Sequence, residues 1–242
     1  MTRMMRPDRL DASAMEYWMQ SADRMGGDLV AAARSPHGRY YVMLADATGH
    51  GLPAAINLLP INRVFYTMVR KNLPVGLIAE RMNASVRDQS PPGRFVVALI
   101  LCFDQANRLL EVWNGGIPMA LFLNEAGQIV RRFTSENLPL GLDEGGAPPH
   151  TVFHRWEGEG QFFACSDGLT DAESPEGKPL GEAPVEMALA AAPASRRFNQ
   201  LRRVVHEHMV GQAPHDDLTA LMVDTRKLLP AVAAAEHGET GK

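Results

Sequence analysis

Residues 40–51 read YYVMLADATGHG and combine an apolar run, an acid and a glycine turn, the pattern that decides the fold. The run that ends at Ala45 has the length and composition of a buried strand, and it delivers Asp46 at its end. From about Leu52 to Lys71 the apolar spacing becomes helical. The stretch therefore predicts a strand, an acid and a helix in direct succession, with Pro60 expected to kink or interrupt the helix.

Three further aspartates occur in similar contexts, each at the end of an apolar, strand-like run or in the turn just after it. They are Asp28 in MGGD (25–28), Asp167 in CSDGLTD (165–171) and Asp216 in PHDDLT (214–219). Carboxylates that converge on one site repel one another unless a cation neutralises them or some take up protons. Oxygen-only ligation suits hard cations such as Mg²⁺ and Mn²⁺ better than zinc. The four acids therefore predict a divalent metal centre.

The remaining chain alternates between strand and helix signals in blocks. The order is strands, two helices, many strands, helices and a final strand, which favours an α+β architecture over repeated βαβ units. Strands are expected at 29–33, 95–103, 109–113, 119–123, 129–133, 151–156, 161–165 and 218–223, and helices at 75–88, 184–192 and 195–210.

Composition limits the class of protein. The chain has 242 residues, 45% of them hydrophobic and 21% charged, with a net charge of −4, and its basic clusters are short. A nucleic-acid partner is therefore not expected. Cys102 and Cys165 lie in apolar runs and are expected to be buried thiols, which favours a reducing cytoplasm. No apolar run has the length of a membrane span or the form of a signal peptide, so no membrane association is expected.

Three segments are expected along the chain. Residues 1–24 would be a short N-terminal segment, the end of a linker from a missing regulatory domain. Residues 25–226 would form the folded domain, and the Ala-rich residues 227–242 a disordered tail.

The four acidic motifs, in this order and with a Gly-His-Gly turn leading into a helix, resemble the SpoIIE/RsbU branch of the PPM-type (protein phosphatase 2C-like) serine/threonine phosphatases. The resemblance runs from about Gly26 to Val223. It implies an α-β-β-α sandwich of two antiparallel sheets flanked by helices. It also implies two Mn²⁺ or Mg²⁺ ions that activate a water against a phosphoserine.

The resemblance assigns roles to particular residues. Asp46 would bridge the two ions, with the backbone carbonyl of Ala47 completing the second site. Asp167 and Asp216 would hold the other ion, and Asp28 would orient or ligate the metal-bound water. Asp46 and Asp28 are accordingly the candidate catalytic residues.

Other residues of the motifs have open roles. His50 stands two positions beyond the place of a histidine in eukaryotic relatives, so a structural role competes with proton donation. Asp171 could support an additional metal or be a solvated acid at a helix start. Asp217 is a candidate outer partner beside the preferred ligand Asp216. Asn114 opens NGGIP, which resembles the family turn Asn-Ala-Gly-His-Pro, and is expected to fix that turn.

The basic residue that grips phosphate in eukaryotic relatives has no match before Asp28, which leaves phosphate affinity to the metals. By resemblance, the substrate is a phosphoserine on a STAS-domain anti-anti-sigma protein. The helices at 52–71 and 75–88 would form a homodimer contact or receive an upstream receiver or PAS-type module. A non-catalytic partner-binding module of the same fold is the alternative, and a metal-dependent nuclease is disfavoured by the absence of a basic surface.

Overall fold

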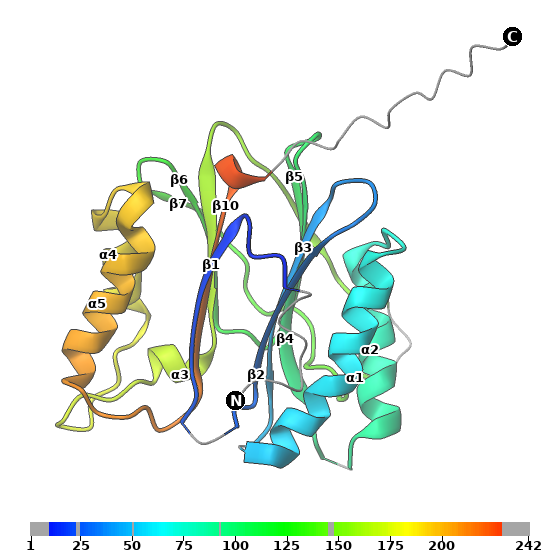
Figure 1. The fold of residues 1–242 in the computed structure, drawn as a ribbon, viewed down its shortest axis with the longest axis horizontal. Helices are drawn as coiled ribbons and strands as arrows, with labels where there is room; N and C mark the ends of the chain where they lie inside the picture. Colours follow the sequence, from blue (N-terminus) through cyan, green and yellow to red (C-terminus); the bar gives the residue numbers. More distant parts are fainter. Residues whose placement is uncertain (1–9, 23–24, 50, 92, 145–147, 229–242) are drawn as a thin grey trace, which may run out of the picture.

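A computed structural model describes residues 10–22, 25–49, 51–91, 93–144 and 148–228. Two five-stranded antiparallel sheets pack face to face, with α1 and α2 covering one outer face and α4 and α5 the other (Figure 1). This is the expected α-β-β-α sandwich. One sheet has the order β1 (Met15–Gln20), β10 (Leu218–Asp224), β9 (Gly160–Cys165), β6 (Met119–Asn124) and β7 (Ile129–Arg132). The other has the order β2 (Asp28–Arg34), β3 (Tyr40–Ala47), β4 (Val96–Asp104), β5 (Leu109–Gly115) and β8 (Val152–Arg155).

The helices agree with the predicted segments. Pro60 lies inside α1, which continues through it without a break, so the expected interruption is wrong. The predicted helix at 195–210 begins with a short 3-10 turn, η2, before α5. The bounds are α1 (Gly51–Val69), α2 (Val75–Gln89), α3 (Asp167–Thr170), α4 (Glu182–Ala191), η2 (Ala194–Arg196), α5 (Arg197–Met209) and η3 (Thr225–Lys227).

Side chains alternate between the two faces of β3, so its apolar residues 40–45 contribute to two hydrophobic cores. Tyr40, Val42 and Leu44 belong to the core between the sheets. Tyr41 and Met43 belong to the core between this sheet and α1 and α2. Successive strand side chains point to opposite faces, so a strand covered on both faces is apolar at every position.

The N-terminal segment contributes a strand that the sequence did not predict. Residues of β1 pair antiparallel with β10, from Met15 opposite Val223 to Gln20 opposite Leu218. The sheet thus includes residues that the expected boundary at residue 25 left outside. At the other end Leu228 is buried in the core between the sheets, within the expected tail, while 229–242 lie outside the described residues.

Both cysteines are buried and free, as the sequence predicted. Within the described part of the chain, no helix combines the length and apolar character needed to cross a bilayer.

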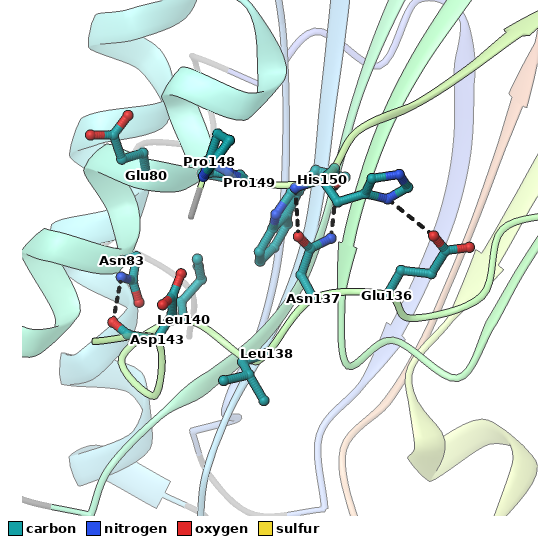
Figure 2. A pocket seen from close by; sticks show the side chains of 12 residues that line it. Glu80, Asn83, Glu136, Asn137, Leu138, Leu140, Asp143, Pro148, Pro149 and His150 are labelled. Carbon is teal, nitrogen blue, oxygen red and sulfur yellow. Dashed lines mark hydrogen bonds and ion pairs between the residues drawn. The ribbon is translucent and has the colours of Figure 1, made fainter. Parts of the chain in front are cut away.

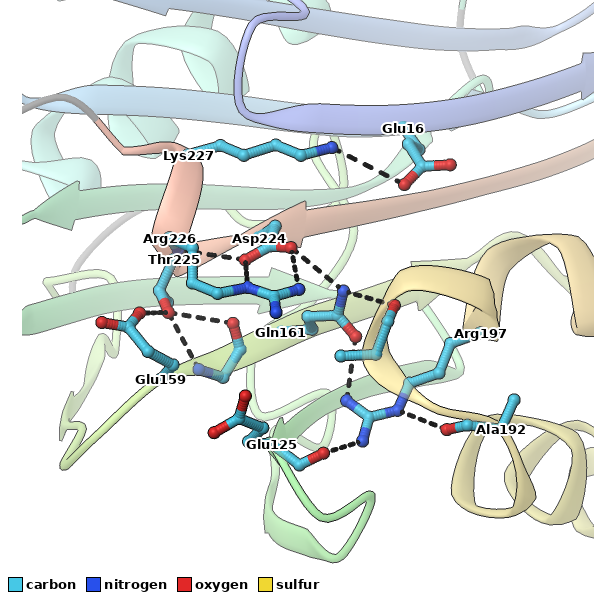
Figure 3. A network of polar contacts seen from close by, with 12 residues as sticks. Glu16, Glu125, Glu159, Gln161, Ala192, Arg197, Asp224, Thr225, Arg226 and Lys227 are labelled. Atoms are coloured by element: carbon cyan, nitrogen blue, oxygen red, sulfur yellow. Dashed lines mark hydrogen bonds and ion pairs between the residues drawn. The ribbon is translucent and has the colours of Figure 1, made fainter.

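A buried arginine joins α5 to the sheet beneath it (Figure 3). Arg197, the first residue of α5, has no exposed surface. Its guanidinium donates to Gln161 Oε1 at 2.9 Å, to the carbonyl of Glu125 at 2.6 Å and to that of Ala192 at 3.3 Å. Gln161 in turn donates to Asp224 Oδ2 at 3.3 Å. One side chain therefore connects the β6–β7 turn, β9 and the start of α5.

Replacing Arg197 with alanine should lower the free energy of unfolding by about 3 kcal/mol, because it leaves buried acceptors without donors. Urea denaturation followed by circular dichroism measures the change. The matched control is Arg196→Ala, at an exposed neighbouring arginine, which should change it by less than about 0.5 kcal/mol. Equal stability of the two variants would show that the contacts of Arg197 contribute nothing.

Candidate metal centre

The two sheets bring three of the four predicted aspartates, Asp46, Asp167 and Asp216, to the lining of one cleft, and Asp28 is buried opposite Asp46. Asp28 opens β2 directly opposite Asp46, near the end of β3. Asp167 opens α3 two residues after the end of β9, and Asp216 lies two residues before β10. Asp28 is the first residue of its strand and Asp216 precedes its strand, so the expectation that these two acids lie at or just after strand ends is wrong. Neighbouring strands run in opposite directions, so the start of one lies beside the end of the next.

Ser166 links Asp28 to the facing sheet. Its hydroxyl donates to Asp28 Oδ2 at 3.0 Å and accepts the backbone N–H of Thr219 at 3.0 Å. The Ser166 N–H also donates to the carbonyl of Thr219 at 3.0 Å. Asp28 belongs to one sheet, and Thr219 belongs to β10 of the other. This buried serine therefore fixes the distance between the two halves of the site.

Asp217 holds the backbone that leads to Asp28. Its carboxylate is buried and accepts the N–H groups of Ala22, at 2.9 Å, and of Gly27. A Cβ on Gly26 would lie 2.8 Å from Asp217 Oδ2, which explains the glycine there. Asp217 thus turns its oxygens toward backbone donors, while Asp216 lines the cleft, in keeping with the roles expected for the pair.

The carboxylates are crowded enough to disfavour their charged forms. Burial, with the charges of Asp217 and Asp167, raises the pKa of Asp28 to about 7. Burial, followed by the charges of Asp28 and Asp167, raises the pKa of Asp46 to about 8. Burial and the charge of Asp216 raise the pKa of Asp167 as well. Such a cluster gains from a cation that neutralises several acids at once.

The donor groups present fit hydrated divalent cations. Asp28 Oδ1 is buried and makes no hydrogen bond of normal geometry among the described residues, and the Thr219 side chain lies close enough to act against the rise in the pKa of Asp28. A Cβ on Gly27 would lie 3.0 Å from the carbonyl oxygen of Ala47, and the glycine keeps that space open. Among the described residues, no three acidic, histidine or cysteine side chains are already close enough to form a metal cage. Mg²⁺ in proteins keeps several waters and uses one or two carboxylates, which agrees with this spacing.

The cleft has a volume of about 580 Å³. Its walls come from the β3–α1 turn, the start of β4 and the segment before β10. The lining residues are Ala22, Asp46, Ala47, Thr48, Gly49, Phe95, Val97, Asp167, His215 and Asp216.

The remaining candidates differ in their places. Asp171 is exposed at the C-terminal end of α3, where its charge contributes to the raised pKa of Asp167. Asn114 fixes its turn, since Nδ2 donates to the carbonyls of Ile117 and Phe133, each at 2.9 Å. Its Oδ1 accepts the N–H of Ile117 at 3.0 Å. His50 lies outside the described residues.

A second hollow, of about 520 Å³, lies between α2 and the segments around Asn137 and His150 (Figure 2). Asn137 Oδ1 accepts the N–H of His150 at 2.9 Å, and Glu136 pairs with the His150 ring at 3.0 Å. The four aspartates do not line this hollow. Asp46, Asp167 and Asp216 line the cleft instead.

Comparison with solved structures defines the class of fold. The SiaA PP2C domain of Pseudomonas aeruginosa superposes with a TM-score of 0.77 at 18% identity, covering 91% of each chain. RsbX in complex with magnesium superposes with a TM-score of 0.66 at 16% identity, covering 87% of this chain and 94% of the other. The fold is that of a PP2C-type phosphatase domain.

Sequence comparison defines the family. The family model described as Stage II sporulation protein E (SpoIIE) matches residues 36–226. The phosphoserine phosphatase RsbP of Bacillus subtilis is 23% identical over 166 residues, which cover 66% of this chain and 40% of the relative. The chain thus spans less than half the length of that curated relative. It belongs to the SpoIIE family.

The sequence did not predict a role for Ser166, and for Asp217 it predicted only an outer place beside Asp216. Ser166 precedes a candidate ligand in the Ser-Asp-Gly motif, and its buried position was the missing information. The doubled acid at 216–217 was a visible signal, but only the structure shows which carboxylate accepts backbone N–H groups.

Replacing Asp217 with alanine should lower the free energy of unfolding by about 2 kcal/mol, because two backbone N–H groups lose their acceptor. It should also weaken Mn²⁺ binding, since the segment leading to Asp28 is no longer held. Thermal unfolding and Mn²⁺ titration measure the two effects. Asp88→Ala, at an exposed acid of α2, is the control. Unchanged Mn²⁺ affinity in Asp217→Ala would separate this residue from the site.

Proposed function

We propose that this chain is a divalent-metal-dependent protein serine/threonine phosphatase. The supporting observation is the place of Asp46, Asp167 and Asp216 in the lining of one cleft, with Asp28 buried opposite Asp46. Membership of the SpoIIE family and similarity to a relative named a phosphoserine phosphatase support the same activity.

Two Mn²⁺ or Mg²⁺ ions are the proposed cofactors, and the RsbX structure with magnesium supports this choice of metal. Asp46 would serve both ions, with the Ala47 carbonyl on one side and Asp167 and Asp216 on the other. Asp28 would orient a water. When bound, the ions supply a water of lowered pKa and neutralise the transferring phosphoryl group.

The protein's own contribution is to hold these oxygens and to exclude a competing nucleophile. Ser166 is buried and its hydroxyl is engaged by Asp28 and Thr219. Burial raises the pKa of the Cys165 thiol well above its usual range, so the cysteine stays protonated. Neither Cys165 nor Ser166, the two residues before Asp167, is therefore suited to attack phosphorus. This supports direct hydrolysis by water.

The proposed substrate is a phosphoserine on a STAS-domain anti-anti-sigma protein in a bacterial partner-switching pathway. The family resemblance supports it, together with similarity to a relative named a phosphoserine phosphatase. The two unpaired, buried cysteines support a reducing cytoplasm as its location.

The Asp46→Asn variant tests the activity. Loss of one shared carboxylate should lower the rate of phosphoserine removal by about 100-fold or more while the fold stays intact. Mass spectrometry of a phosphorylated STAS protein incubated with Mn²⁺ measures the rate, and circular dichroism checks the fold. Asp88→Asn is the matched control. An inactive wild-type chain that still binds the STAS protein would favour the non-catalytic alternative, and equal rates in both variants would place the reaction elsewhere.

Regulation is proposed to act through α1. This helix begins at Gly51, four residues after Ala47, so a shift of the helix moves the Ala47 carbonyl. Leu52, Ile56 and Leu59 form an apolar stripe on α1 and are 49%, 50% and 38% exposed. A regulatory receiver or PAS-type module is the proposed occupant, because most of the length of RsbP lies outside the matched part. A second copy of this chain is the other outcome that a test can reveal.

Fusion to a regulatory module should lower the Mn²⁺ concentration for half-maximal activity. Ile56→Ser should abolish that effect, because it places a polar group in the apolar stripe, while leaving the activity of the unfused chain unchanged. The measurement is Mn²⁺-dependent hydrolysis of p-nitrophenyl phosphate, with light scattering to detect dimers. Identical Mn²⁺ requirements in fused and unfused chains would contradict a regulatory role of α1.

A further inference from the structure

Arg94 lies beside the turn that carries the central acid. In the antiparallel pairing of β3 and β4, Ala47 lies opposite Val96. The pairing continues past the strands, since the N–H of Thr48 donates to the carbonyl of Phe95 at 3.1 Å. The next residue of this segment, Arg94, therefore comes opposite Gly49, three residues beyond Asp46.

The Arg94 side chain folds over the space left by that glycine. Its Nη1 donates to the carbonyl of Thr48 at 2.9 Å. A Cβ on Gly49 would lie 2.7 Å from the same nitrogen, and Gly49 has a φ of +88°. The glycine thus permits both the turn and the close approach of the guanidinium. Because Thr48 and Gly49 line the cleft, Arg94 stands at its rim.

Most of the guanidinium is open to a ligand. Arg94 is exposed, and among the described residues its hydrogen-bond partner is the Thr48 carbonyl, with no carboxylate paired to it. An arginine offers five N–H donors in a planar fork that matches phosphate oxygens. The Thr48 contact uses one nitrogen and fixes the position of the side chain.

The charge balance of the proposed site leaves a role for the positively charged guanidinium of Arg94. Two divalent ions carry four positive charges, which the four aspartates cancel. A phosphomonoester dianion then meets a cleft with no net attraction. His215 lines the opposite side but lies 3.5 Å from Glu173 Oε2. Arg94 adds a permanent positive charge beside the turn that lines the cleft.

We propose that Arg94 binds the phosphoryl oxygens of the phosphoserine substrate and confers the affinity of the site for phosphate monoesters. This proposal rests on the proposed phosphatase function. The competing role for the same geometry is purely structural, in which Arg94 only pins the turn after Asp46 and acts on the Ala47 carbonyl.

Inorganic phosphate and p-nitrophenyl phosphate are the probes. With Mn²⁺ saturating, Arg94→Ala should raise the KM for p-nitrophenyl phosphate and the inhibition constant of phosphate by about tenfold or more. The Mn²⁺ concentration for half-maximal activity should stay within about twofold of wild type. Arg94→Lys should restore part of the phosphate affinity, because it keeps the charge and loses the fork. Arg70→Ala, at an exposed arginine after α1, is the control.

The readouts separate the two roles. A higher Mn²⁺ requirement with an unchanged inhibition constant of phosphate would overturn the proposal and leave Arg94 as a structural pin. Thermal unfolding with Mn²⁺ and phosphate gives a readout that does not need turnover. If the wild-type chain is inactive, a phosphate-induced rise in melting temperature that disappears in Arg94→Ala still supports phosphate binding by Arg94. No rise in wild type, or an equal rise in both, overturns it.

Discussion

Mutual repulsion among buried carboxylates is the constraint on which the rest of this structure depends. Asp28 and Asp46 lie opposite each other in adjacent strands, and Asp167 and Asp216 approach from the facing sheet. Burial and neighbouring charge raise the pKa of Asp46 to about 8, so the cluster disfavours full ionisation near neutral pH. A fold that keeps such a cluster must hold it rigidly and leave room for a cation. Rigidity comes from the two sheets, and the glycines beside the acids leave the room.

Hydrogen bonds from a few buried side chains account for this rigidity. Ser166 connects the acid of one sheet to the backbone of the other, and Asp217 holds the segment that precedes Asp28. In the sheet that contains β9 and β10, Arg197 connects α5 to β9. In each case a buried polar side chain satisfies backbone or amide groups from distant segments. These contacts explain why a site made from four separate motifs can keep one geometry.

The sequence predicted the strands, the helices and the four aspartates because these features are local. The buried strand β3 is apolar from Tyr40 to Ala45, and α1 follows it with helical spacing. Strand β1 escaped prediction, because it is a six-residue strand at a sheet edge in which only Met15 is buried, so it lacks an alternating apolar pattern. The roles of Ser166, Asp217 and Arg94 also required the structure. Each depends on a partner far along the chain, 138 residues for Ser166 and Asp28 and 195 for Asp217 and Ala22. The family resemblance identified the acids and their order, but not the side chains that hold them.

The central claim is that these aspartates form one site for divalent cations. Calorimetric titration of the metal-free chain with Mn²⁺ tests it most directly, because it counts bound ions without needing a substrate. We expect two Mn²⁺ per chain, as in two-metal sites of phosphatases, and loss of at least one in the Asp46→Asn variant. Absence of Mn²⁺ and Mg²⁺ binding by the folded wild-type chain, or binding that Asp46→Asn leaves unchanged, would contradict the claim.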